Sequence, residues 1–438
     1  MTDTHTLDKP QMITISDAEA GAFFPSGLEY NPPARGMWNI VHMGMLLPEA
    51  HQIFACAQGC LRGVILTAAE MLALDRLSWI SVSESDMFDG TLESDIIDGV
   101  CEILQKLDKR PPVVLLYLSC IHLFAGCDFE MILGELSHRY SDIMFVDCYM
   151  TPTMRQTVSP VTKMSAQLYG ALKPLPLNPK AVGIIGNDRP TDEASELVRI
   201  LRENGFTLRD ITLCGSYEDY MALADCCINI SYLPTAGLAG EELQRRFGAK
   251  HLPLAARYDF DGIAQNYQLL CDALGVSVPD FSQETAQARQ ALRNARAVIG
   301  DRPIAIDYTA VTRPFELAWL LWEHGFSVKY VIADSAGGEE AAFEKLKANC
   351  PDFEIYAAAN INMLDMPDRV HEPVLDIGQK AAYYFATNHF VNIVANGGYY
   401  GYAGIQKIAA LMTEAYQTPK DRKKVLRHKG FGCQSCLL

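Results

Sequence analysis

Residues 113–120 read Val-Val-Leu-Leu-Tyr-Leu-Ser-Cys, and this stretch decides the fold prediction. Its first six residues offer no charged face, which is typical of a parallel strand that is buried on both sides. Short β-rich runs alternate with helical segments around it, from about residue 50 onward. Strands that alternate with helices form parallel sheets covered by helices, so the sequence predicts an α/β fold.

The alternation repeats in three similar blocks, which we predict to be three Rossmann-like domains with parallel sheets flanked by helices. Three domains also suit a chain of 438 residues at roughly 150 residues per domain. The predicted divisions are an N-terminal α/β domain at 1–175, a second α/β domain with a helical hinge at 176–300, a third α/β domain at 301–415 and a C-terminal tail at 416–438. The tail carries a run of lysines and arginines that we expect to be solvated.

Acidic residues outnumber basic ones by 53 to 37, which gives a net charge of −16. Nucleic acids and anionic membrane surfaces attract basic patches, so neither is expected as the main partner. The longest charge-free apolar stretch of the N-terminal third, residues 36–48, is too short to span a bilayer. No charged segment followed by an apolar one opens the chain, so we expect no secretory signal and a cytoplasmic location.

Cysteines follow two of the predicted strands. Cys56 and Cys60 lie at the end of the strand near residue 55, and Cys120 directly follows the buried strand. Cys127 comes seven residues later, where the next helix is expected to begin, and a helix start favours a thiolate. Open α/β sheets bind ligands beyond the carboxyl ends of their strands, so we expect these four thiols to converge. Four thiolates suit an iron–sulfur cluster or zinc.

Two other interpretations of these cysteines stay open. Zinc is disfavoured by the spacing, because Cys56-x3-Cys60 differs from the tight Cys-x2-Cys pair of a structural zinc site. His122 lies two residues after Cys120, and we expect it to be a hydrogen-bonded core residue rather than a ligand. Packing in the core is a common fate of free cysteine, and it is the role we expect for Cys101 in the middle of a helix.

Six short motifs resemble, in their order along the chain, component 1 of nitrogenase and its relatives. This family includes the molybdenum–iron protein, its cofactor-assembly scaffold and the dark-operative protochlorophyllide reductase. The resemblance covers nearly the whole chain. The motifs are Tyr-Asn-Pro-Pro-Ala-Arg-Gly at 30–36, Ala-Gln-Gly-Cys at 57–60, Leu-Ser-Cys at 118–120, Ala-Val-Gly-Ile-Ile-Gly-Asn at 181–187, Glu-Glu-Leu-Gln-Arg-Arg-Phe-Gly at 241–248 and Gly-Gly-Tyr-Tyr-Gly-Tyr-Ala-Gly at 397–404.

The resemblance implies a three-domain α/β subunit that holds an iron–sulfur cluster where it meets a second subunit. The partner would be a homologous D-type subunit in an α2β2-like complex, or an identical subunit in a homodimer. Electrons would come from a separate ATP-dependent iron protein. In agreement, this chain has no Gly-x-x-x-x-Gly-Lys-Ser/Thr loop, and we expect no ATP site on it.

The cluster ligands depart from the family pattern in one place. The family's first ligand cysteine falls at about Gly36, which has no side chain to donate, and Cys56 stands where β-type subunits have a glycine. The resemblance therefore implies Cys56, Cys60 and Cys120 as metal ligands. Three thiolates from each of two subunits would hold an eight-iron, P-cluster-like [8Fe-7S] centre. With Cys127 as a fourth ligand, one subunit would hold a [4Fe-4S] cluster by itself.

The large cofactor of nitrogenase is bound by a cysteine of the second domain and a histidine of the third. Here Tyr400 takes the histidine position, and Tyr232 or Leu233 takes the cysteine position. Cys226 and Cys227 lie about five residues too early, and we expect them in the core. The chain therefore resembles the β-type (K-type) subunit, which relays electrons and does not bear the substrate site.

These implications make the chain a subunit of a nitrogenase-like two-component reductase that passes low-potential electrons to a D-type partner. The substrate on that partner would be a methylthio-alkane, cleaved reductively at its C–S bond, or a tetrapyrrole. The alternative is a cofactor-assembly scaffold, which holds a precursor cluster without turnover. A structural α/β protein without metal is the third interpretation.

Three further features have two interpretations each. Cys433-x-x-Cys436 near the C-terminus is a redox pair, or a contact to a metal or a partner. The tyrosines of the 397–404 turn either pack there or line a cavity. Arg313 and Glu316 either pair across a domain cleft or form a surface ion pair of little energetic weight, and we expect the second.

Overall fold

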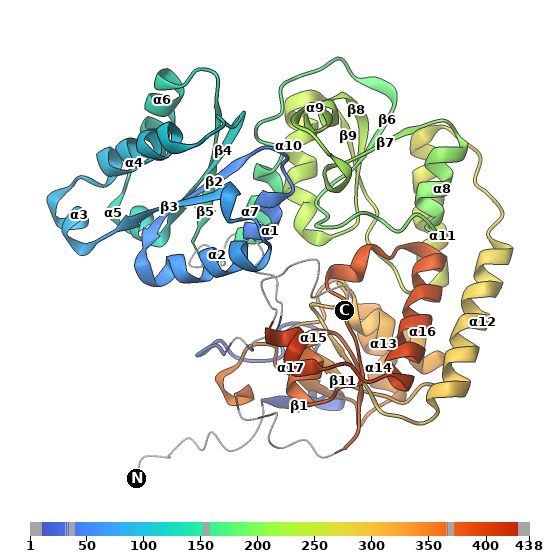
Figure 1. Cartoon of the computed structure of the whole chain (residues 1–438). Coiled ribbons are helices and arrows are strands. Elements are labelled where there is room, and N and C mark those ends of the chain that lie inside the picture. Colours follow the sequence, from blue (N-terminus) through green and yellow to red (C-terminus); the bar gives the residue numbers. More distant parts are fainter. Residues whose placement is uncertain are drawn as a thin grey trace, which may run out of the picture.

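The computed structural model describes residues 11–30, 32, 34, 40–151, 158–364, 366 and 372–427. Within this part the chain forms three β-sheets, each flanked by helices (Figure 1). The strands of each sheet run parallel, apart from one edge strand of the third sheet. The predicted α/β fold class is confirmed.

The first sheet has the strand order β3-β2-β4-β5, and the apolar run at 113–119 is its strand β4 (Val113–Ser119). All of β4 is buried, because its alternate residues pack on opposite faces. Leu115 and Tyr117 face α2 and α7, while Val114 and Leu116 face α4 and α6. The elements of this domain are α1 (Ile40–Met45), β2 (His51–Ala57), α2 (Gln58–Glu70), β3 (Leu77–Val82), α3 (Glu84–Asp89), α4 (Leu92–Lys106), α5 (Cys120–Ala125), α6 (Phe129–Arg139), β5 (Met144–Met150) and α7 (Pro160–Gln167).

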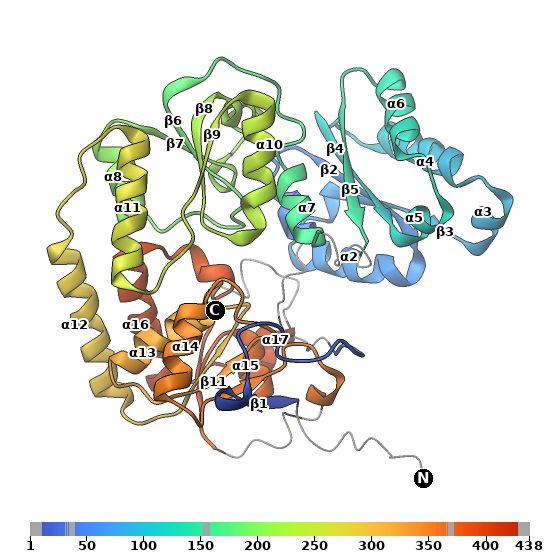
Figure 2. The same cartoon turned by 180° about the vertical axis from the view of Figure 1, so that it is seen from behind.

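The second sheet has the strand order β7-β6-β8-β9, and two long helices connect it to the third sheet. These helices, α11 (Phe260–Leu274) and α12 (Ser282–Ile299), correspond to the predicted helical hinge. They run beside α16 along one side of the molecule (Figures 1 and 2). The remaining elements are β6 (Asn178–Ile184), α8 (Glu196–Glu203), β7 (Thr207–Asp210), α9 (Tyr217–Ala222), β8 (Cys226–Ser231), α10 (Gly237–Phe247) and β9 (Lys250–Pro253).

The third sheet has the order β1-β12-β11-β10-β13-β14, and it includes a strand from the opposite end of the chain. β1 (Met12–Thr14) pairs antiparallel with β12 (Glu354–Tyr356), so the N-terminal segment belongs to the C-terminal lobe (Figure 1). The sequence analysis did not predict this strand. The other elements are β10 (Ile304–Asp307), α13 (Pro314–Glu323), β11 (Val328–Ile332), α14 (Glu340–Asn349), β13 (Leu375–Ile377), α15 (Gln379–Tyr384), β14 (Phe390–Val391), α16 (Gly401–Gln417) and α17 (Arg422–Arg427).

Part of the basic C-terminal tail packs on the third domain. α17 contacts α15, and Val425 is buried beside Ala382 and Phe390. Lys423 and Lys424 of the same helix are exposed, as expected of a solvated charge run, while Val425 gives this short helix an apolar contact. Cys433 and Cys436 lie outside the described residues.

A buried carboxylate joins the second and third domains. Glu196, in the first turn of α8, accepts the Tyr267 hydroxyl at 2.8 Å and the Ala403 N–H at 3.0 Å. The second bond satisfies a free N–H group in the first turn of α16, so this carboxylate caps a helix of another domain. Gly401 lies against it with φ of 75°, where a Cβ would overlap both the Tyr267 hydroxyl and the Glu196 carboxylate.

A second buried carboxylate, that of Glu316, was expected at the surface. Glu316 is buried and binds Arg257 Nε at 2.9 Å, Arg313 Nη2 at 3.1 Å and the Tyr258 N–H at 2.8 Å. Arg257 follows β9 of the second domain, so the group spans two domains. The expectation of a weak surface pair is wrong, because a buried ion pair with several hydrogen bonds strongly resists the loss of one partner.

The Gly401 turn provides a test of this domain junction. Gly401→Ala should lower the stability of the chain by about 2–4 kcal/mol, because a left-handed backbone and a steric overlap both penalise the new Cβ. Unfolding in urea, followed by circular dichroism, measures the change. Gly237→Ala is the matched control, since a Cβ there meets nothing within 4 Å. Equal stability of the two variants would contradict the role given to the Glu196 contact.

Candidate functional site

The pairing of β2 with β4 brings three cysteines to one edge of the first sheet. Ala55 lies opposite Leu118, so Cys56 comes next to Ser119 at the carboxyl ends of the two strands. Cys120 is the first residue of α5, and Cys60 lies in the first turn of α2. Both helices begin directly after their strands. This edge is where open parallel sheets bind their ligands.

Cys56 has the most buried thiol of the three. It is 1 % exposed, and burial raises the pKa of its thiol to about 12, with a smaller contribution from the neighbouring Cys60 and Cys120 thiols. A thiol in such surroundings ionises only when a cation compensates the charge, and a thiolate-bound metal does this. The three cysteines therefore fit a metal of soft character.

Cys60 and Cys120 lie nearer the surface. Cys60 is exposed and Cys120 is half-buried. Ala57, which precedes α2, provides no side-chain cap, so N–H groups in the first turn of this 13-residue helix are free to face a negative ligand near Cys60. Ligands on this edge are therefore accessible from outside the subunit.

His122 is a helix-capping residue. Its Nδ1 lies 3.2 Å from the N–H of Ser119, which precedes α5, and Ser119 in turn caps α5. Burial lowers the pKa of His122, so the neutral ring accepts the Ser119 N–H. The hydrogen-bonded core role expected for this histidine is consistent with these contacts.

Cys127 lies in different surroundings, in the turn between α5 and α6. Burial, with a smaller contribution from the Glu93 carboxylate, raises the pKa of its thiol to about 11. Asp128 caps α6 by accepting the Met131 N–H at 2.9 Å. The neighbouring negative charge makes Cys127 a poorer thiolate than a helix start alone would suggest.

Within the described part of the chain, no group of three or more His, Cys, Asp or Glu side chains is arranged to hold a metal ion. Cys56, Cys60 and Cys120 lie at the same edge of the sheet, but they do not form such a group. Gly36, the position that matches the family's first ligand, lies outside the described residues. Cys101, which was expected in the core, is partly buried against the apolar cluster of α4 and α6 and also accepts a hydrogen bond from Arg139.

Large apolar side chains on two helices that begin at this edge of the sheet face solvent. Phe88 on α3 is 88 % exposed and Phe124 on α5 is 72 % exposed, and Met87 and Leu123 beside them are also exposed. α3 and α5 begin at the carboxyl ends of β3 and β4, the same edge that carries the thiols. Exposed apolar patches of this kind are frequent at surfaces that bind other proteins.

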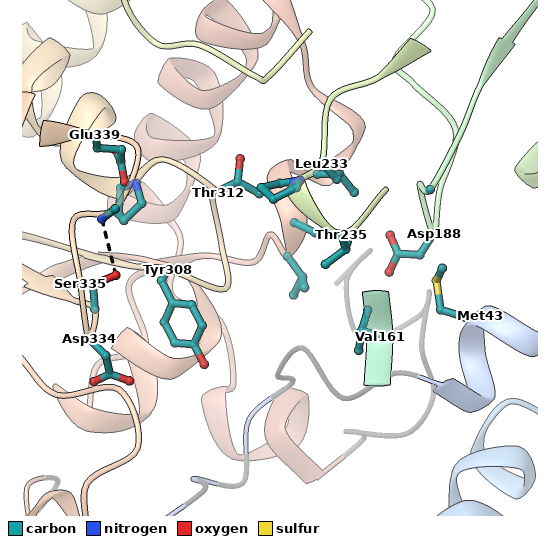
Figure 3. Close-up of a pocket in the computed structure, with 17 residues that line it drawn as sticks. Met43, Val161, Asp188, Leu233, Thr235, Tyr308, Thr312, Asp334, Ser335 and Glu339 are labelled. Carbon is teal, nitrogen blue, oxygen red and sulfur yellow. Dashed lines mark hydrogen bonds between the residues drawn. The ribbon is translucent and has the colours of Figure 1, made fainter. Parts of the chain in front are cut away.

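A cavity of about 340 Å³ lies between the domains, away from the cysteines. Tyr308 and Asp334 line it directly after β10 and β11, and Asp188 and Leu233 line it after β6 and β8. The two groups of residues face each other across the space (Figure 3). The sequence did not predict this cavity, although it lies at the carboxyl ends of strands, as the cysteines do.

The tyrosines compared with cofactor ligands pack in the core. Tyr400 is buried, accepts a hydrogen bond from Asn266 at 2.9 Å and lies against the ring of Tyr232. Only Leu233 of the candidate positions lines the cavity. Cys226 is buried and Cys227 donates to a backbone carbonyl, as expected for core cysteines.

Comparison with known proteins shows the family to which this fold belongs. The family model for nitrogenase component 1 type oxidoreductases matches residues 41–417. The chain belongs to the nitrogenase component 1 family. Members of this oxidoreductase family bind iron–sulfur clusters and work in multi-subunit complexes with an iron protein.

Solved structures of this family share the fold. The structure titled "Nitrogenase Cp1 at pH 6.5" is 16 % identical, with a TM-score of 0.69, and the match covers 91 % of this chain and 96 % of the other. "Nitrogenase Cp1 at pH 5" is 12 % identical, with a TM-score of 0.58, covering 93 % and 94 %. A search of curated proteins found no match. Among the described residues of this family member, no helix is long and apolar enough to cross a membrane.

The different burial of the thiols predicts their order of reaction. In metal-free chain prepared under reducing conditions, iodoacetamide should label Cys60 at least tenfold faster than Cys56, because Cys56 is buried and its thiol pKa is raised. Peptide mass spectrometry at timed intervals measures both rates. The buried Cys148 is the internal control and should react only after unfolding. Equal labelling of Cys56 and Cys60 in the folded chain would contradict this geometry.

Proposed function

We propose that this member of the nitrogenase component 1 family is the β-type (K-type) subunit of a two-component reductase. It would relay electrons from an ATP-dependent iron protein to a substrate site on a homologous D-type subunit, in an α2β2-like complex. The observation that supports the proposal is the position of Cys56, Cys60 and Cys120 at one edge of the sheet, where helices with exposed apolar side chains also begin.

The cysteines have distinct tasks in holding the cluster. Cys56 anchors it from the buried side, and Cys60 and Cys120 reach it from the first residues of α2 and α5. Bound there, an iron–sulfur cluster would take up and release single electrons at low potential. The first turn of α2 contributes N–H groups, which stabilise negative charge on the sulfur atoms.

The exposed apolar side chains argue for a second subunit over the cluster. Phe88 and Phe124 together with their neighbours would leave water when a partner covers this edge. The partner would also supply the ligands that the described residues of one chain do not gather. Six thiolates from two subunits suit an [8Fe-7S], P-cluster-like centre, and the position of Cys127 beside Glu93 favours this over a [4Fe-4S] cluster within one subunit.

The described lining of the interdomain cavity supports the β-type assignment. It contains no cysteine and no histidine, so it lacks the soft donors that hold an iron cluster. The substrate site is therefore proposed on the partner. We propose reductive C–S cleavage of a methylthio-alkane as its reaction, in which two electrons and two protons yield an alkane and methanethiol.

The cysteine assignment is tested by iron content. Cys60→Ala or Cys120→Ala should remove most of the iron and the electron paramagnetic resonance signal of anaerobically purified protein, because each loss opens the ligand set. Cys101→Ala is the matched control and should keep both. If Cys127→Ala also keeps its iron, the cluster is shared by two subunits. Full iron content in Cys60→Ala would contradict the assignment.

The reductase function is tested by reconstitution. The complex with its homologous subunit and iron protein should consume ATP and reductant and release ethane and methanethiol from ethyl methyl sulfide. The Cys120→Ala complex should do so more than tenfold more slowly. Gas chromatography and the absorbance of dithionite measure the two processes. A complex that holds its cluster but consumes no electrons would identify an assembly scaffold instead, and a tetrapyrrole in place of the thioether would identify the other reductase class.

A further inference from the structure

The interdomain cavity has no part in the proposed electron relay, yet it is built as a binding site. Its volume of about 340 Å³ is enough for a small organic molecule. Apolar side chains form much of its wall, from three different domains. These are Met43, Val161, Leu233, Pro234, Pro314, Ala333 and Val394.

A tyrosine held by a buried lysine provides one polar group in the cavity. Lys380 is 3 % exposed, and its Nζ donates to the Tyr308 hydroxyl at 3.0 Å. An ammonium group has no lone pair, so Tyr308 Oη is the acceptor and keeps its own proton for another partner. Within the described residues, no other hydrogen bond involves this hydroxyl. Tyr308 extends into the space between the two sides of the cavity (Figure 3).

The charge of Lys380 is compensated from both sides. Burial raises the pKa of Asp307 and Asp334, and the Lys380 ammonium acts against that rise on each of them. Asp334 lines the cavity and accepts the Ala358 N–H at 2.8 Å. The lysine thus lies within electrostatic range of two carboxyl groups, and its hydrogen bond orients the Tyr308 hydroxyl.

Glu339 provides the second polar group on the same side. It is 5 % exposed, and one of its oxygens accepts the Glu316 N–H at 2.8 Å. Burial raises the pKa of Glu339 to about 8, so its carboxyl group keeps a proton at neutral pH and can donate it. Two O–H groups thus face a mainly apolar space.

We propose that this cavity binds a small, uncharged organic molecule with a hydrogen-bond-accepting group such as a carbonyl, to which the Tyr308 hydroxyl donates. An anion would meet the carboxylates of Asp188 and Asp334 in the lining, and a cation would bring no acceptor for the Tyr308 proton, whose oxygen Lys380 already occupies with a positive charge. A neutral acceptor avoids both, and its apolar part contacts the walls. This site goes beyond the proposed function and does not depend on the cluster.

Four probes of one size separate the ligand classes. Acetophenone carries the acceptor, ethylbenzene lacks it, benzoate is an anion and benzylammonium is a cation. The full chain, purified anaerobically with its partners and cofactors, should bind acetophenone roughly three- to tenfold more tightly than ethylbenzene, as one hydrogen bond predicts. Ligand-observed NMR titration measures the four affinities. If Cys60→Ala protein keeps the preference for acetophenone, binding at this site does not depend on the cluster.

Variants locate the binding. Tyr308→Phe should remove the preference for acetophenone, while Tyr416→Phe, whose ring faces Arg302 outside the cavity, should keep it. Gly337→Leu should abolish binding of both neutral probes, since a Cβ at this lining position meets only Ser335 Oγ at 3.7 Å and the side chain fills the space. The proposal is overturned if Tyr308→Phe keeps the preference, if a charged probe binds more tightly, or if no binding is lost in Gly337→Leu.

Discussion

The parallel pairing of β2 with β4 is the constraint on which the candidate metal site depends. With Ala55 opposite Leu118, both strands end at the same level, and the next residues of each chain segment carry thiols. A shift of the pairing by one residue would move Cys56 to the other face of the sheet, because side chains alternate along a strand. The pairing is fixed by the burial of β4 on both faces. A core strand thus determines where surface chemistry can occur.

Buried carboxylates hold the second and third domains in register. Glu196 caps α16, and Glu316 binds Arg257 and Arg313 from different domains. Such groups are costly to bury alone and favourable only when every oxygen has a partner, so they permit one arrangement of the domains. The cavity between the sheets exists because of this arrangement. Its polar lining groups follow the strand ends of two sheets that these contacts keep facing each other.

The sheet edge that carries Cys56, Cys60 and Cys120 and the interdomain cavity differ in the chemical groups that they present. Soft sulfur donors lie at an edge rimmed by exposed aromatic side chains, which suits a metal shared with another subunit. Oxygen-bearing side chains line the cavity. The Tyr308 hydroxyl, which accepts from Lys380, and the raised pKa of Glu339 favour neutral ligands there. The membership of the chain in the nitrogenase component 1 family agrees with the first of these sites, whereas the second derives from the side chains of this chain.

The local sequence was sufficient to predict the fold class and most of the helices and strands. The run at 113–118 and the alternation of strands with helices identified parallel sheets, since a buried strand must be apolar on both faces. The order of elements along the chain also predicted that Cys56, Cys60 and Cys120 lie at the carboxyl ends of strands, where open α/β sheets bind ligands. β1 could not be predicted in this way, since three residues pair with a strand more than 300 positions away.

What only the tertiary structure decided are the contacts between elements far apart in sequence. Glu316 resembled a surface residue until Arg257 was placed beside it, and Tyr308 gained its role only through Lys380. The sequence by itself determined which side chains end each strand, because that depends on local patterning. The tertiary structure decided which strand ends face each other and which charges are buried, because burial depends on neighbours that no local pattern encodes.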